Sequence, residues 1–420
     1  GRAVEPCAAI CRQIGGYPGP CYNHSYARSA REEFLKQVVA RYAGCRAMSM
    51  WDVWNEPESC FLFRQPHEST LCSYIHFTHS RMRYGSLEGL NEVWGRCYNN
   101  WDELELPRVR NTFTDMIDWR LFHLDTLGAE ARRRISTVKS IDNRHPVYLH
   151  PVPNVLYPFN PVTGVDDFQI ADGCDCFGGT ANGVPAETLQ TVAAAQGRVS
   201  YNVESHLCAG AASMYSRLLT VQDFADNFLP QIGLGIRGFL HWQYRGESLG
   251  AEAPAWGLLD VNGREGASHA GAVDFWKKLR PVAKRIMEAP LEPPAVAVFK
   301  SCSNEIFQWC MNGNFDDLHK GITGYTQLLY RKNLRLTYVN DRMLIDGLPA
   351  SIKLLIMPNC YAMQQPVAEA LSEWVLNGGT LICEAHTGGY NLSTGRHSRD
   401  LPGLGLVPAV TTGAEIKTSG

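Results

Sequence analysis

The sequence predicts an α/β protein of two domains, each built around a parallel sheet. Short apolar runs that favour strands alternate with longer segments of helical periodicity, and this order is typical of parallel sheets. The chain has 420 residues, more than one ordinary domain holds. A proline-rich run, residues 289–294, interrupts the pattern. We therefore expect one domain at residues 1–288 and a second at residues 295–420.

The composition is that of a soluble globular protein, with 45% hydrophobic and 19% charged residues. The chain has 39 lysines and arginines and 42 aspartates and glutamates. It therefore lacks the excess of positive charge that would favour binding of nucleic acid. No apolar stretch approaches the roughly 18–20 residues of a membrane span. The 14 scattered cysteines are typical of thiols in a reducing compartment. We expect a cytoplasmic protein that binds neither nucleic acid nor membrane.

The first predicted strand, residues 48–57, has the sequence MSMWDVWNEP. It is apolar on both faces, as in a parallel strand covered on both sides, and it closes on Asn55 and Glu56. A carboxylate at the carboxyl end of such a strand is where α/β barrels place catalytic groups; the alternative is a glutamate that merely faces water. Three nearby aromatic residues are suited to stack on a sugar: Trp51, Trp54 and Phe61.

Further elements follow in order. In the first domain, the predicted strands end near residues 54, 150, 177, 204 and 243, and the main predicted helices span residues 29–43, 115–140, 221–229 and 273–287. Residues 57–83 are expected to form an irregular insert, followed by a turn and a short helix at 84–95. In the second domain, we expect strands at 296–299, 335–338, 353–357 and 380–383, with helices at 323–332 and 365–375.

Glu56 and Glu204 each close a predicted strand. Two carboxylates at neighbouring strand ends can cleave a glycosidic bond, one by protonating the leaving oxygen and the other by attacking the anomeric carbon. Several strand-end acids occur in any α/β protein of this size, so this pattern alone leaves other readings open. His150 and His241 also lie on predicted strands, as core histidines or as pocket residues.

A cysteine and a histidine in the second domain form a weaker candidate for a catalytic site. Cys360 and His386 each follow a strand, which is one arrangement of a nucleophilic cysteine and its base. The segment around Cys360 lacks the glycines of a nucleophile elbow, so a structural cysteine is the favoured interpretation.

Several motifs together resemble the β-galactosidases of glycoside hydrolase family 42. They occur at residues 51–56, 83–95, 101–102, 107–108, 202–204, 242–245, 250–252 and 256–260. The resemblance implies a (β/α)8 TIM barrel followed by a flavodoxin-like trimerisation domain. It also implies a retaining enzyme that cleaves terminal β-D-galactosides and forms a homotrimer.

Roles carried over from that family fall on particular residues of this chain. Glu56 matches the acid/base and Glu204 the nucleophile. Asn55 would bind the sugar 2-hydroxyl, and Trp242 would lie against the sugar ring. The remaining candidates for a hydroxyl-binding carboxylate are Glu247 and Glu252, and the sequence does not choose between them.

The chain departs from the family pattern at three points. Pro57 stands where the family more often has Tyr, which leaves an arabinoside, mannoside or glucoside as alternative substrates. The family's zinc cluster is reduced to Cys60, His67 and Cys72, so we expect no zinc requirement. Only five of eight barrel strands are counted, so we expect a barrel lacking its first three strands; a non-catalytic sugar-binding protein is the alternative.

Overall fold

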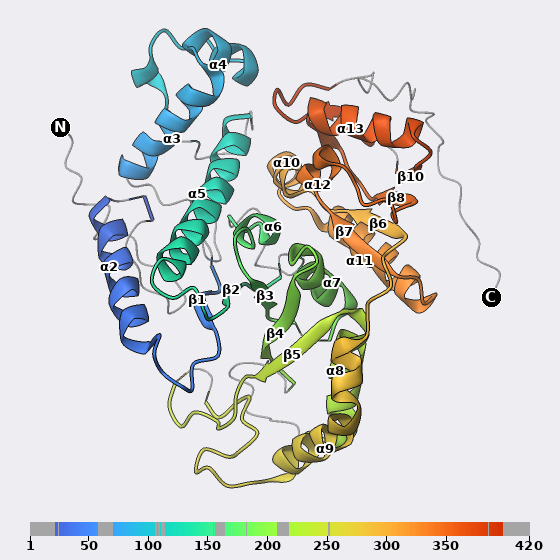
Figure 1. Cartoon of the computed structure of the whole chain (residues 1–420). Helices are drawn as coiled ribbons and strands as arrows, with labels where there is room; N and C mark the ends of the chain where they lie inside the picture. The colour runs from blue at the N-terminus through green and yellow to red at the C-terminus, as the bar shows by residue number, and fades with distance from the viewer. Residues whose placement is uncertain are drawn as a thin grey trace. The chain divides into compact units, whose positions relative to one another are not determined.

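The computed structural model places most of the chain (Figure 1). It describes residues 22–23, 25–57, 70–105, 107, 110, 114–153, 155, 164–181, 183–207, 218–250, 253–384 and 386–397. The chain divides into two compact units, residues 1–80 with 119–293 and residues 81–118 with 294–420. Each unit is described by itself.

Five short parallel strands form the centre of the first unit. They are β1 (Trp51–Asn55), β2 (Val147–His150), β3 (Cys176–Gly179), β4 (Val199–Ser205) and β5 (Ile236–His241). β1 pairs with β2, and β3, β4 and β5 pair in that order. The backbone N–H of Thr180 donates to the carbonyl of Pro151 at 3.0 Å and thereby joins the ends of β3 and β2. All five predicted strands are confirmed, and among the described residues they form two hydrogen-bonded sheets.

Side chains of neighbouring strands in the first unit pack closely against one another. Tyr148 of β2, Cys176 of β3 and Val203 of β4 form a buried cluster. Gly238 of β5 lies so close to Tyr201 that an added Cβ would meet the ring at 2.7 Å. Glycine is therefore required there for β5 to pack beside β4.

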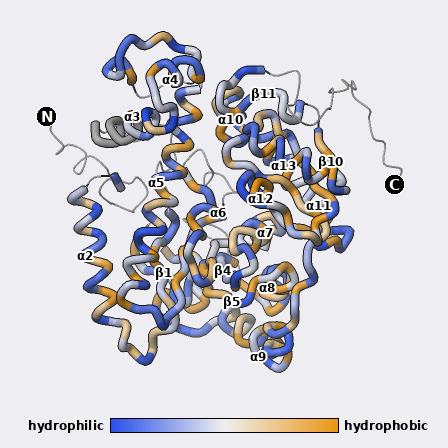
Figure 2. Tube along the Cα trace, turned by 45° about the horizontal axis from the view of Figure 1, so that its top comes forward, coloured by the Kyte–Doolittle hydropathy of each residue, from blue (hydrophilic) through white to orange (hydrophobic). Residues whose placement is uncertain are grey.

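Helices surround the strands of the first unit (Figure 1). They are α2 (Ser25–Tyr42), α5 (Thr114–Lys139), α6 (Asp167–Ile170), α7 (Pro185–Ala194), α8 (Val221–Leu234) and α9 (Ala267–Glu288). A further helix, α3 (Thr70–Tyr84), crosses the division between the two units, as does the start of α5. Hydrophobic and hydrophilic stretches alternate along helices such as α9 (Figure 2). Phe224 and Phe228 of α8 pack with Phe275 of α9 in one buried cluster, which fastens both helices by apolar burial.

Three helices of the first unit were not named individually from the sequence. The insert predicted to be irregular up to residue 83 contains α3, which corrects that prediction, and α6 and α7 occupy gaps between predicted strands. Pro185 stands in the first turn of α7, where its missing N–H costs nothing. The short helix expected at 84–95 is confirmed as α4 (Leu87–Trp94): the Ser86 side chain caps its start, and Gly95, with φ +66°, ends it.

The second unit contains a four-stranded parallel sheet. Its strands are β6 (Val296–Phe299), β7 (Leu336–Val339), β8 (Leu354–Met357) and β10 (Thr380–Cys383), and they lie in the order β10-β8-β6-β7. The associated elements are α10 (Cys302–Asn312), α11 (Asp316–Arg331), α12 (Asp341–Asp346), α13 (Gln365–Leu376), η1 (Trp101–Glu103), β9 (Ala362–Met363) and β11 (Tyr390–Asn391). The four predicted strands are confirmed. Within the described part of the chain, no helix is both long and apolar enough to cross a membrane.

Candidate active site

The carboxyl ends of the first unit's strands bring the predicted site residues into one row. Asn55 of β1 is in register with His150 of β2, and Ser205 of β4 with His241 of β5. The backbone N–H of Glu56 donates to the carbonyl of His150 at 2.6 Å. Since Glu204 directly precedes Ser205, both predicted catalytic carboxylates stand at the same edge of these strands, where α/β proteins place their ligands.

Glu204 is held by two imidazoles. His150 Nε2 lies 3.2 Å from Glu204 Oε2, and His206 Nε2 lies 3.0 Å from Glu204 Oε1. The Glu204 side chain is 13% exposed. Burial raises the pKa of this carboxyl, but the hydrogen bonds from His150 and His206 outweigh it and lower the pKa to about 2. Glu204 is therefore an ionised carboxylate at neutral pH, as a nucleophile requires.

His150 connects Glu204 to β1. Its Nδ1 lies 3.3 Å from Asp52 Oδ2, and its Nε2 is also 3.1 Å from the hydroxyl of Thr180. Burial lowers the pKa of His150, but hydrogen bonds to Asp52 and Glu204 outweigh it and raise the pKa to about 9. The imidazole is consequently protonated at neutral pH. Of the two strand histidines considered from the sequence, this one belongs to the site.

An irregularity in β1 precedes Glu56. The register of β1 on β2 shifts between Asp52 and Asn55. Asp52 Oδ1 accepts the backbone N–H of Trp54 at 3.1 Å, and Arg134 Nη1 donates to the carbonyl of Val53 at 3.3 Å. These side chains satisfy backbone groups that a regular ladder would have paired. Glu56 itself has φ +43°, a conformation that non-glycine residues adopt mainly where function or turn geometry demands it.

Trp51 and Trp54 are packing residues, which corrects their assignment as sugar-stacking candidates. Both are only 8% exposed. Trp51 Nε1 donates to Asp142 at 3.0 Å, and the Arg134 guanidinium lies 3.9 Å from the centre of the Trp54 ring. Their faces are thus covered by protein. Phe61 lies outside the described residues.

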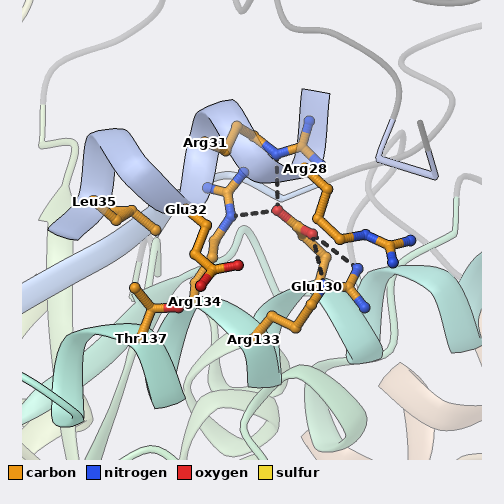
Figure 3. Close-up of a pocket in the computed structure, with 8 residues that line it drawn as sticks. All are labelled: Arg28, Arg31, Glu32, Leu35, Glu130, Arg133, Arg134 and Thr137. Atoms are coloured by element: carbon orange, nitrogen blue, oxygen red, sulfur yellow. Dashed lines mark hydrogen bonds and ion pairs between the residues drawn. The ribbon is translucent and has the colours of Figure 1, made fainter. Parts of the chain in front are cut away.

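A cluster of arginines supports this part of β1. Glu130 of α5, only 3% exposed, pairs with Arg31 of α2 at 3.0 Å and with Arg133 and Arg134 of its own helix at 2.9 and 3.0 Å. The small cavity in Figure 3 lies among these side chains, between α2 and α5. Because Glu130 and its arginines already satisfy one another, this cavity is a structural junction that fixes Arg134 against β1.

Aromatic side chains lie at the carboxyl end of β5 and in the segment that follows it. Trp242 follows the strand, is 37% exposed, and donates its backbone N–H to Ser205 at 3.1 Å. The rings of Trp256 and His206 pack with their centres 4.4 Å apart and their planes inclined by 34°. His241 packs near Phe224 of α8 and its Nε2 lies 3.2 Å from the carbonyl of Trp256. Burial lowers the pKa of His241 to about 4, so it is a neutral histidine turned toward α8.

The other predicted residues are placed as follows. Glu247 is exposed on the segment after β5. Glu252, Cys60 and His67 lie outside the described residues, as does the side chain of Cys72. No group of three or more metal-binding side chains occurs in the described ranges.

Cys360 is a buried structural cysteine. It is 1% exposed, its Sγ lies 3.8 Å from the carbonyl of Ala362, and burial raises its pKa well above the ordinary value. A reactive cysteine needs access and a stabilised thiolate, and this one has neither.

Asp52, Thr180 and His206 were missed from the sequence. Asp52 had a visible signal, because it is the one charged residue within the apolar run of the first strand. Thr180 and His206 follow strands and carried no signal beyond that position.

Comparisons with known proteins identify the family of the chain. The model of glycoside hydrolase family 42, described as beta-galactosidase, matches residues 8–280. Beta-galactosidase bgaB of Geobacillus kaustophilus is 24% identical over 411 residues, which is 91% of this chain and 57% of that protein.

Two solved structures are similar in fold. A beta-galactosidase from Bacillus circulans sp. alkalophilus has a TM-score of 0.78 at 18% identity, over 91% of this chain and 58% of that one. The GH42 exo-carrageenase of Bacteroides ovatus has a TM-score of 0.77 at 16% identity, over 96% of this chain and 58% of that one. The chain thus spans somewhat more than half the length of these relatives.

Proposed function

Since the chain belongs to glycoside hydrolase family 42, we propose that it hydrolyses terminal β-D-galactosides, with Glu204 as nucleophile and Glu56 as acid/base. The observation that carries this proposal is the carboxylate of Glu204. Two imidazoles hold it ionised at the carboxyl end of a parallel strand, in the same row as Glu56. The relatives of this chain are named beta-galactosidases, and these names support galactose as the proposed sugar.

The proposed reaction is a double displacement. Glu204 attacks the anomeric carbon while Glu56 protonates the departing glycosidic oxygen, so the bond to the aglycone breaks as a glycosyl ester forms. Glu56, now a carboxylate, takes a proton from water. That water attacks the anomeric carbon, releases the sugar with retained configuration, and restores Glu204.

Sugar binding is assigned to residues around this pair. Asn55, next to Glu56, is proposed to hold the 2-hydroxyl, and partly exposed Trp242 to lie against the apolar face of the ring. Glu247 or Glu252 is proposed to bind a further hydroxyl. The double displacement needs no metal, so we propose that zinc is not required.

A different sugar is the second candidate. Pro57 follows the proposed acid/base, and one fold relative is named an exo-carrageenase, so the family fold is not confined to proteins named beta-galactosidase. Arabinoside, mannoside and glucoside are therefore tested beside galactoside.

The second unit is proposed to be a flavodoxin-like assembly domain without a catalytic role. In chain order its strands lie as 2-1-3-4 across the sheet, which is the start of the flavodoxin-like order. We propose that it supports a homotrimer in the cytoplasm; light scattering on the eluting protein would show a mass three times that of the chain.

A panel of p-nitrophenyl β-glycosides tests the proposal. Hydrolysis of the galactoside with the highest kcat/KM supports it, and a preference for another sugar selects the second candidate. If the folded protein hydrolyses none of these glycosides, both candidate functions are wrong and a non-catalytic sugar-binding role is favoured.

A further inference from the structure

Asp52 contacts both halves of the candidate site. Its Oδ1 accepts the Trp54 N–H at 3.1 Å, within the irregular end of β1 that leads to Glu56. Its Oδ2 lies 3.3 Å from His150 Nδ1. One carboxylate thus secures the strand end that bears Glu56 and also holds the imidazole that contacts Glu204.

His150 can satisfy its neighbours only when it carries two protons. Carboxylates stand at both ring nitrogens, Asp52 Oδ2 at Nδ1 and Glu204 Oε2 at Nε2. A neutral imidazole has one N–H and would turn a lone pair toward one of these oxygens. The ring is only 7% exposed, so water cannot easily relieve that repulsion.

We propose that Asp52 and His150 are positioning residues, which orient the carboxylate of Glu204, keep it ionised, and tie it to the strand end that carries Glu56. This inference rests on the proposed function of Glu204. Asp52 retains the proton on His150, His150 directs an N–H at one oxygen of Glu204, and His206 directs another at the second oxygen. The nucleophile is therefore fixed in its plane from two sides before substrate arrives.

Two charged groups contact the His150 ring, Asp52 of β1 and Glu204 of β4. Each has a further titratable partner: Tyr148 of β2 hydrogen-bonds to Asp52, and His206 pairs with Glu204. The two carboxylates are in direct contact with the ring, and both favour the imidazolium form. Removing the charge of Asp52 should therefore release the proton of His150.

The first experiment reads that proton directly and needs no substrate. Long-range 1H–15N spectra of the 15N-histidine-labelled chain report which ring nitrogens are protonated, and the signal absent from His150→Gln identifies His150. We expect both nitrogens protonated at pH 8 in the wild type and a neutral ring in Asp52→Asn. A neutral His150 at pH 8 in the wild type would overturn the inference.

The second experiment follows kcat/KM against pH on p-nitrophenyl β-galactoside. His150→Gln keeps an N–H donor but not the charge, and we expect kcat to fall about 100-fold with little change in KM. The acidic limb should also move to higher pH, because Glu204 loses the charge that keeps it ionised. Asp52→Asn should behave in the same way.

Asp172→Asn is the matched control, the same substitution at a half-exposed surface carboxylate, and should leave the profile unchanged. Thermal unfolding verifies that each variant is folded. If Asp52→Asn does not fold, His150→Gln by itself tests the inference. Lower activity with an unmoved acidic limb would indicate a merely structural role and refute the inference. If the wild type hydrolyses no glycoside, the proposed function fails while the spectra still decide the role of Asp52 and His150.

Discussion

Both units place a cation and a carboxylate at the carboxyl end of a parallel sheet, yet the two pairs differ in exposure. In the first unit, His150 meets Glu204, whose side chain is 13% exposed and has a second imidazole on its other oxygen. In the second unit, Lys300 meets Glu305 at 2.8 Å, and both side chains are fully buried. The position at strand ends is therefore shared by a partly exposed carboxylate and by a fully buried ion pair. Access, rather than topology, distinguishes them.

The largest effect should come from removing the accessible carboxylate. Glu204→Gly should lower kcat by about 10⁴-fold or more, because no glycosyl ester can form. Azide, small enough to enter the space left by the side chain, should restore part of the turnover and yield a glycosyl azide of inverted configuration.

Glu305→Gln is the counterpart in the second unit and should leave kcat unchanged per folded molecule. Near-normal activity of Glu204→Gly would remove Glu204 from the mechanism. A comparable loss of kcat in folded Glu305→Gln would remove the distinction between the two pairs.

The next effect depends on the substrate. Glu56→Ala should reduce hydrolysis of galactosides with poor leaving groups by about 10²–10⁴-fold and should affect dinitrophenyl galactosides much less, because only the former need protonation. The measurement is kcat/KM across a series of aglycones. Equal losses throughout the series would mean that Glu56 is not the acid.

The third effect concerns stability. Lys300→Met leaves Glu305 as a buried charge without its cation, which should lower the free energy of unfolding by about 3–5 kcal/mol. Urea denaturation measures the change, and Lys284→Met is the control, since Lys284 lies on α9 with an 87% exposed side chain. An unchanged urea midpoint in Lys300→Met would show that the Lys300–Glu305 pair does not stabilise the fold.

The strands could be predicted from apolar runs in the sequence, because a parallel strand buried on both faces consists mainly of apolar residues. The same logic could not predict how Trp51 and Trp54 point. Trp54 lies within the irregularity between Asp52 and Asn55, where Arg134, 80 positions later than Trp54 in the chain, donates to the carbonyl of Val53. Likewise, the contact between Asp52 and His150 follows from the register of two strands that are distant in sequence.

The resemblance in sequence proposed Glu56 and Glu204 as the catalytic pair, and this assignment stays a prediction. The resemblance offered no means of finding the residues that contact them. His206 is an example of a residue whose contact with Glu204 could not be predicted from the sequence. A histidine after a strand-end glutamate is an ordinary neighbour in the sequence, and only the fold shows that its ring turns back to the carboxylate.

The smallest effect should come from the cysteine that the sequence places after β8. Cys360 is 1% exposed and lies within the apolar core of the second unit, so Cys360→Ala removes only a sulfur atom from a packed site. We expect a loss of about 1 kcal/mol in the free energy of unfolding and no change in kcat or KM. Native Cys360 should resist iodoacetamide under conditions that modify exposed Cys97, as followed by mass spectrometry of peptides. A nucleophile would show the opposite pattern, with rapid alkylation of Cys360 and loss of activity in the alanine variant, and the second unit would then have chemistry of its own.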